Sequence, residues 1–107
     1  MGQVWVKSKE YVEEQAQTSV KDRLSFSTQI FMDEKARSLG YDNILNLCTY
    51  ATSTNKRFAK EGRAGLKWRD SVWTLVHKIM EDVLAGKREA PTRQEIISEL
   101  PDIVWPE

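Results

Sequence analysis

The sequence has little of the material from which most catalytic and metal sites are made. Its 107 residues contain one cysteine, Cys48, and one histidine, His77. A single cysteine cannot form a disulfide within the chain, and a single histidine rules out zinc sites built on a histidine pair. Cys48 and His77 also lack a recognisable third member for a nucleophilic triad. We therefore expect a protein that is not an enzyme and that binds no metal or cofactor.

An excess of charge of one sign and long apolar runs are also missing. Sixteen basic residues balance sixteen acidic ones, so bulk attraction to nucleic acid or to an anionic membrane is not implied. No apolar run approaches the roughly 20 residues needed to cross a bilayer, and the first residues do not have the pattern of a signal peptide. The segment 62–65 matches neither nucleotide-binding fingerprint. We expect no membrane or small-molecule partner and a place in a cytoplasm, or in something assembled there.

What the chain does contain is enough apolar material for one folded domain. Hydrophobic residues make up 40% of it and charged residues 30%, which is an ordinary globular composition. The predicted fold class is all-α, a small helical bundle around one long helix, with short extended terminal arms. We expect a single helical domain over 1–107: an N-terminal arm with a short helix over 1–21, a helical body over 22–100 and a C-terminal tail over 101–107.

The first half of the chain predicts three helical segments. A short one over 10–16 would follow Ser8, and Asp22 is the expected N-cap of a longer helix that reaches Leu39. Gly40 supplies the residue that commonly ends a helix. The apolar positions that we expect this helix to bury are Phe26, Ile30, Phe31, Met32, Ala36 and Leu39. Asp42 then caps a short helix that ends at about Ala51.

The long helix is predicted over about 56–85. One broad apolar face joins the following residues at helical spacing: Phe58, Gly62, Gly65, Leu66, Val72, Trp73, Val76, Met80, Val83 and Leu84. Gly86 ends the helix. Thr92 and Glu95 form a capping box that opens a last short helix, which ends before Pro101.

Two glycines in the first half of the long helix need a reason, because each costs roughly 1 kcal/mol relative to alanine. Gly62 and Gly65 indicate a close crossing by another backbone, and the short helix that ends at Ala51 is the natural neighbour. The alternative is that Gly62 breaks the helix and leaves a separate turn over 56–61.

One charge pattern stands above background. Four basic residues recur at i, i+4, i+7 and i+11 on the side of the long helix opposite its apolar face; we call them the basic stripe: Lys56, Lys60, Arg63 and Lys67. Such a stripe could contact phosphates or an acidic protein surface. Equally, charge runs are usually the solvated face of an amphipathic helix.

Aromatic residues give the other candidate binding positions. Trp68 and Trp73 are five residues apart and cannot share one helix face, so we expect Trp73 in the core and Trp68 at its edge, available to a partner helix or subunit. Trp5 and Trp105 lie in the terminal arms and would either dock on the body or anchor a partner. Cys48 and His77 are expected to be structural, Cys48 buried and His77 half-buried.

Five segments between residues 36 and 106 stand out as a set: Gly40-Tyr41-Asp42-Asn43-Ile44, Cys48-Thr49-Tyr50-Ala51, Arg57-Phe58-Ala59-Lys60-Glu61-Gly62-Arg63-Ala64, Trp68-Arg69-Asp70-Ser71-Val72-Trp73, and Ala90-Pro91-Thr92 to Glu99-Leu100-Pro101. On these segments, residues 36–106 resemble a family of small proteins and C-terminal domains encoded in the tail gene clusters of phages and prophages. The resemblance implies a setting in a phage tail, tail fibre or baseplate, so that the chain is found in the virion or in the host cytoplasm during assembly.

Two functions from different classes follow. The first is a non-enzymatic, tail-associated structural or assembly protein that acts through contacts with tail or fibre proteins, or with copies of itself. It could be a permanent part of the virion or a chaperone that leaves. The alternative is a nucleic-acid-binding or regulatory protein that uses the basic stripe at 56–69.

Overall fold

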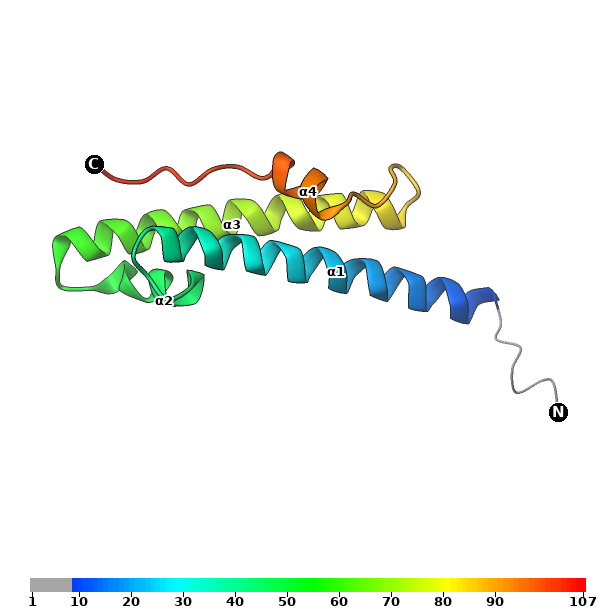
Figure 1. Cartoon of the computed structure of the whole chain (residues 1–107), viewed down its shortest axis with the longest axis horizontal. Coiled ribbons are helices and arrows are strands. Elements are labelled where there is room, and N and C mark those ends of the chain that lie inside the picture. Colours follow the sequence, from blue (N-terminus) through cyan, green and yellow to red (C-terminus); the bar gives the residue numbers. More distant parts are fainter. Residues whose placement is uncertain (1–8) are drawn as a thin grey trace.

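The fold is all-α, as predicted, and two long antiparallel helices make up most of it. In the computed structural model, which describes residues 9–107 and their side chains from Ser19 onward, the elements are α1 (Lys9–Ser38), α2 (Ile44–Thr49), the 3₁₀ turn η2 (Tyr50–Thr52), α3 (Lys56–Leu84) and α4 (Arg93–Glu99). α1 and α3 lie side by side, and α2 and η2 form the turn between them (Figure 1). After α4 the chain runs back as an extended tail along α3 (Figure 1).

α1 is one continuous helix, so the predicted split into a short helix over 10–16 and a second helix capped by Asp22 was wrong. The segment 17–21 contains neither glycine nor proline, and nothing in it stops a helix that has already begun. Asp22 therefore lies inside the helix. The expected cap at Ser8 and the start of the predicted arm lie outside the described residues.

The prediction for the side of α1 that faces the core is confirmed only in part: Met32 and Ala36 are fully buried as expected, and Phe31 packs against the core. Leu24, Thr28 and Met32 are almost fully buried, whereas Phe26 is 68% exposed. Successive positions four apart make one face of a helix, and here that face passes through a polar residue. Thr28 is tolerated there because its hydroxyl donates to the carbonyl of Leu24 at 2.7 Å. The predicted set omitted Leu24 and Thr28 and wrongly included Phe26.

The helix ends confirm the local signals in the sequence. Gly40 and Gly86, which follow α1 and α3, both have positive φ, 96° and 75°. At the start of α4 the capping box of Thr92 and Glu95 is complete. The N-cap of α2 is Asn43 rather than Asp42.

The core is a single cluster that draws on all four helices. Its fully or nearly fully buried apolar residues are Leu24, Met32, Ala36, Ile44, Leu47, Cys48, Trp68, Val72, Val76, Ile79, Met80 and Ile96. The second half of α3 thus forms the centre of the fold. Cys48 is buried as expected, and burial raises the pKa of its thiol.

The predicted crossing at the two glycines is confirmed. A Cβ added to Gly62 would overlap the backbone nitrogen of Ala51, and one added to Gly65 would lie 2.6 Å from the side chain of Leu47. α3 is unbroken through both positions. The turn formed by α2 and η2 is therefore held directly against the first half of α3.

Candidate functional site

The four residues of the basic stripe all lie exposed on the first three turns of α3. No ion pair joins any of them to a carboxylate of residues 19–107. Arg63 only reaches the carbonyl of Ala51, with 3.5 Å between Nη1 and the oxygen. These side chains are therefore exposed on the surface, where they place four positive charges on one side of one helix.

Trp68 covers a neighbouring helix, which is one of its two expected roles, but it is not available to another subunit, which corrects its prediction as a partner-binding residue. Only 3% of Trp68 is exposed. Its ring packs edge-on against that of Phe31, with 5.9 Å between the ring centroids, and its indole Nε1 donates a hydrogen bond of 2.8 Å to the carbonyl of Pro101. Trp73, which we expected in the core, is partly buried and packs against the core cluster. Trp68 is the more deeply buried of the two because α1 and the C-terminal tail cover the side of α3 that carries it. His77 is exposed beside Trp73 rather than half-buried.

Trp105 docks on the body of the protein. Its side chain is partly buried, and its ring meets Tyr41 edge-on at 6.4 Å. Together with Arg57 and Lys60 of α3 it lines an open cavity of about 450 Å³. The C-terminal arm is thus packed beside the basic stripe. Trp5 lies outside the described residues.

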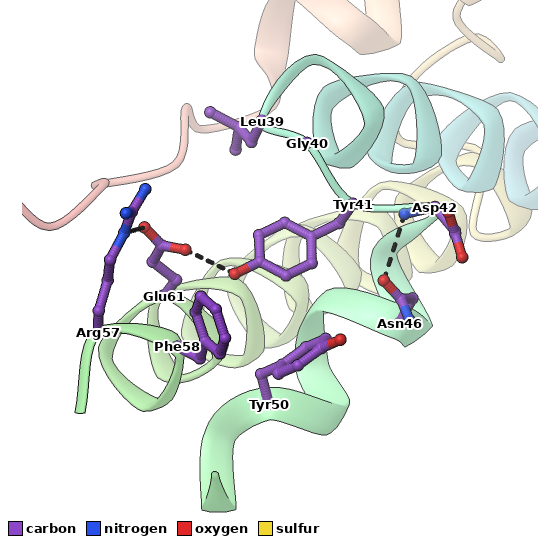
Figure 2. A pocket seen from close by; sticks show the side chains of 9 residues that line it. All are labelled: Leu39, Gly40, Tyr41, Asp42, Asn46, Tyr50, Arg57, Phe58 and Glu61. Carbon is purple, nitrogen blue, oxygen red and sulfur yellow. Dashed lines mark hydrogen bonds and ion pairs between the residues drawn. The ribbon is translucent and has the colours of Figure 1, made fainter. Parts of the chain in front are cut away.

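A second cavity of about 450 Å³ opens on the same end of the molecule; we call it the aromatic pocket. Figure 2 shows the side chains that line it: Leu39, Gly40, Tyr41, Asp42, Asn46, Tyr50, Arg57, Phe58 and Glu61. They come from the turn that follows α1, from α2 and η2, and from the first two turns of α3. Sequence reasoning did not predict this site.

The helix end at Gly40 brings Tyr41 into the pocket. The amide of Gly40 donates to the carbonyl of Arg37 at 3.1 Å and the amide of Tyr41 to that of Ala36 at 3.0 Å. These two bonds are the Schellman pattern, in which a glycine with positive φ turns the chain sharply away from the helix axis. The turn directs the Tyr41 ring across to α3, where its hydroxyl points at Glu61 (Figure 2).

Glu61 is the polar centre of the pocket. Only 9% of it is exposed, and it accepts a hydrogen bond of 2.5 Å from the hydroxyl of Tyr41 and one of 3.3 Å from Nε of Arg57. A buried carboxylate needs such partners, because removing it from water without them would be costly. Burial, and then the contact with Glu61, raise the pKa of Tyr41 to about 12. The hydroxyl is therefore a hydrogen-bond donor throughout the physiological range.

Three aromatic rings surround this carboxylate. The ring centroids of Tyr41 and Tyr50 are 5.3 Å apart at an interplanar angle of 61°, and those of Tyr50 and Phe58 are 5.6 Å apart at 74°. Edge-to-face contacts of this kind are the favoured packing of aromatic pairs. They leave Phe58 38% exposed, although the sequence pattern had placed it on the buried face.

One signal in the sequence could have revealed the pocket. Glu61 is the only acidic residue among the six basic ones over 56–69, and it lies 18 residues before Ile79, which is buried. Eighteen residues are five helical turns, so the two share one face of α3. A carboxylate on the core side of a helix requires a partner, and the nearest tyrosines in the sequence were the candidates.

Neither a metal centre nor a membrane span is found in the part of the chain that the structure describes. Among the side chains described, those of residues 19–107, there is no cluster of three or more histidine, cysteine, aspartate or glutamate residues suited to a metal ion. None of the helices described is long and apolar enough to cross a membrane. No protein-family model, curated protein or solved structure matches the chain. Arguments about function therefore depend on the residues themselves.

Proposed function

We propose that this protein is a non-enzymatic, tail-associated structural or assembly protein of a bacteriophage that docks on an acidic protein surface through the basic stripe. The phage setting rests on the resemblance of residues 36–106 to the tail-cluster family. The docking surface rests on one observation, the four exposed basic side chains on one side of α3 that form no ion pair within 4 Å with a carboxylate of residues 19–107.

The stripe differs from most of the other basic side chains in the described part of the protein. Six of those have a carboxylate within 4 Å: Lys35, Arg57, Arg69, Lys78, Arg88 and Arg93. In the stripe, by contrast, the charges repeat along about 16 Å of helix, since each residue rises 1.5 Å. A helix held rigid by the crossing at Gly62 presents these charges in a fixed arrangement, which favours specific electrostatic docking.

An acidic protein is favoured over nucleic acid as the partner. The formal net charge of the chain is zero. The tail also brings carboxylates close to the stripe, because Lys67 and Asp102 line one cavity and Lys60 and Glu107 another. Neighbouring negative charge opposes a polyanion that must lie along the whole helix. Nucleic-acid binding remains the alternative, and the same variants test it.

The test is charge reversal of the stripe with a matched control. The variant Lys60→Glu/Arg63→Glu/Lys67→Glu is compared with Lys21→Glu/Arg23→Glu/Lys87→Glu, which makes the same change in net charge at three other exposed positions. Virions and tail precursors from the phage genome that encodes the chain are purified, and the chain in them is quantified by mass spectrometry. We expect the wild type and the control to co-purify with tail material and the stripe variant to be lost.

Other outcomes of the experiment count against the proposal. Absence of the wild-type chain from both virions and tail precursors contradicts the phage-tail role. Equal loss of both variants contradicts the stripe as the docking surface. Salt-dependent DNA binding by the wild type that only the stripe variant loses would replace the proposal by the nucleic-acid alternative.

A further inference from the structure

We propose that the aromatic pocket is a binding site for an organic cation, an ammonium or guanidinium group that lies against the rings and is held by the Glu61 carboxylate. This inference does not depend on the docking role of the basic stripe. It rests on the charges that line the pocket, on the arrangement of its rings and on the side chain that now neutralises Glu61.

The lining of the pocket carries an excess of negative charge. Asp42 and Glu61 contribute two carboxylates, and Arg57 contributes the only guanidinium. Glu61 is almost fully buried, so its field is screened less than that of a surface carboxylate. Because the Tyr41 hydroxyl donates to Glu61, it is not free to bind an anion. A cation is the ligand that this set of charges favours.

The rings supply a surface that suits the same ligand. Tyr41, Tyr50 and Phe58 come together between η2 and the first turns of α3, and each ring is steeply inclined to its neighbour (Figure 2). Aromatic faces carry partial negative charge and attract a cation within about 6 Å of the ring centroid. With Phe58 38% exposed, the ring cluster is open to solvent on one side.

Arg57 acts as an internal competitor in this arrangement. Its side chain is 81% exposed, whereas that of Glu61 is 11% exposed, and their contact is 3.3 Å long. The guanidinium end of this pair lies in solvent and Glu61 keeps its hydrogen bond from Tyr41, so the arginine can swing into water when another cation replaces it at the carboxylate. The contact with Glu61 marks where a positively charged nitrogen is accepted, and an incoming cation would take that place.

This competition makes an unusual prediction, that loss of a basic residue tightens the binding of a cation. If Arg57 occupies the carboxylate about nine-tenths of the time, its removal lowers the apparent dissociation constant by about tenfold. A site for anions or for neutral rings would respond in the opposite way or not at all. The sign of the effect therefore identifies the class of ligand.

The experiment is titration of the wild type and of Arg57→Gln with tetramethylammonium and methylguanidinium, followed by NMR shifts of the Tyr41, Tyr50 and Phe58 rings. Neutral tert-butanol and N-methylurea are the matched probes without charge. Lys78→Gln is the control variant, because Lys78 and Asp82 form an i,i+4 pair like that of Arg57 and Glu61, farther along α3. All variants are checked for their folded state by circular dichroism.

We expect saturable NMR shifts with both cations. Binding should be about tenfold tighter in Arg57→Gln than in the wild type and unchanged in Lys78→Gln. In Tyr50→Leu, which loses one ring, binding should be about threefold weaker. If a blocked arginine or lysine binds more strongly than the simple cations, the ligand is the side chain of a partner protein. If the simple cations bind more strongly, the ligand is a free amine. Both results support the proposal. Cation binding that is absent from Arg57→Gln, weaker in it, or matched by the neutral probes overturns the proposal.

Discussion

The contact between Tyr41 and Glu61 links two parts of the chain that are 20 residues apart. It joins the turn after α1 to the second turn of α3 through a hydrogen bond of 2.5 Å to a nearly buried carboxylate. Hydrogen bonds to charged groups contribute more to stability than those between neutral groups. At the scale of single residues, this pair shapes the aromatic pocket and fastens the end of α1.

The first prediction concerns the pH dependence of that contact. The pKa of Tyr41 is raised from 10.0 to about 12 in the folded protein, so above pH 10 the unfolded chain loses the proton before the folded chain does. The stabilisation from Tyr41 is therefore complete below pH 10 and is lost as the pH rises towards 12. Tyr41→Phe should lower the free energy of unfolding by about 1–3 kcal/mol at pH 8.

Urea denaturation of the wild type and Tyr41→Phe at several pH values between 8 and 11.5 provides the measurement. We expect the difference between them to be constant below pH 10 and to shrink above it. Lysines and the other tyrosines are present in both proteins, so their titration cancels in the comparison. A difference that stays constant up to pH 11.5 would show that the pKa of Tyr41 is not raised.

At the scale of elements, the signals that the sequence carried locally were the ones that worked. Gly40, Gly86 and the capping box at Thr92 each act within a few residues, and each helix end appeared where it was predicted. The glycines of α3 identified the crossing by α2 and η2, because a glycine inside a helix lowers its stability and is favoured where another segment must approach closely.

Predictions failed where a distant segment decides the environment. The tail that covers Trp68 is 33 residues away from it, and no pattern within α3 could show that cover. The pocket depends on the same kind of contact, since Glu61 and Tyr41 lie on different elements. The buried face of α1 was predicted only in part for another reason: a buried threonine that bonds to its own helix looks polar in the sequence.

The second prediction tests the crossing at α3. Gly62→Ala should destabilise the protein by about 1–3 kcal/mol, even though alanine favours a helix by roughly 1 kcal/mol. The new Cβ would meet the backbone of Tyr50 and Ala51, which cannot move without shifting η2. Gly65→Ala meets only the side chain of Leu47, and a side chain shifts more readily than the backbone of η2, so it should cost less. Urea denaturation of both variants measures the difference, and equal losses would argue against a tight crossing at Gly62.

At the scale of the whole molecule, the tail connects the two ends of the fold. From α4 it runs back along α3 until Trp105 meets Tyr41 at the aromatic pocket (Figure 1). An ion pair of 3.3 Å between Lys35 and Asp102 and the hydrogen bond from Trp68 hold its first residues. The basic stripe, the pocket and Trp105 thus lie together at one end.

The third prediction is that Trp68 holds the tail in place. Trp68→Phe removes the donor to the Pro101 carbonyl and part of a buried ring, and should lower the free energy of unfolding by about 1–3 kcal/mol. It should also make the bonds after Pro101 more susceptible to proteolysis. Trp73→Phe is the matched control, because Trp73 is only partly buried and should change both quantities less. A larger effect of the control would restore the roles that the sequence pattern assigned to the two tryptophans.

The antiparallel packing of α1 and α3 also has a mechanical consequence. Lys9 begins α1 at the end of the molecule opposite the basic stripe, and α1 is about 45 Å long at 1.5 Å per residue (Figure 1). Tension applied between Lys9 and a partner on the stripe runs parallel to both helix axes. That load passes along α1 and reaches the stripe through α2 and η2, which join the two helices at this end. Because this connection is packed against α3 at Gly62 and Gly65, the load reaches the stripe through a fixed turn rather than through a free loop.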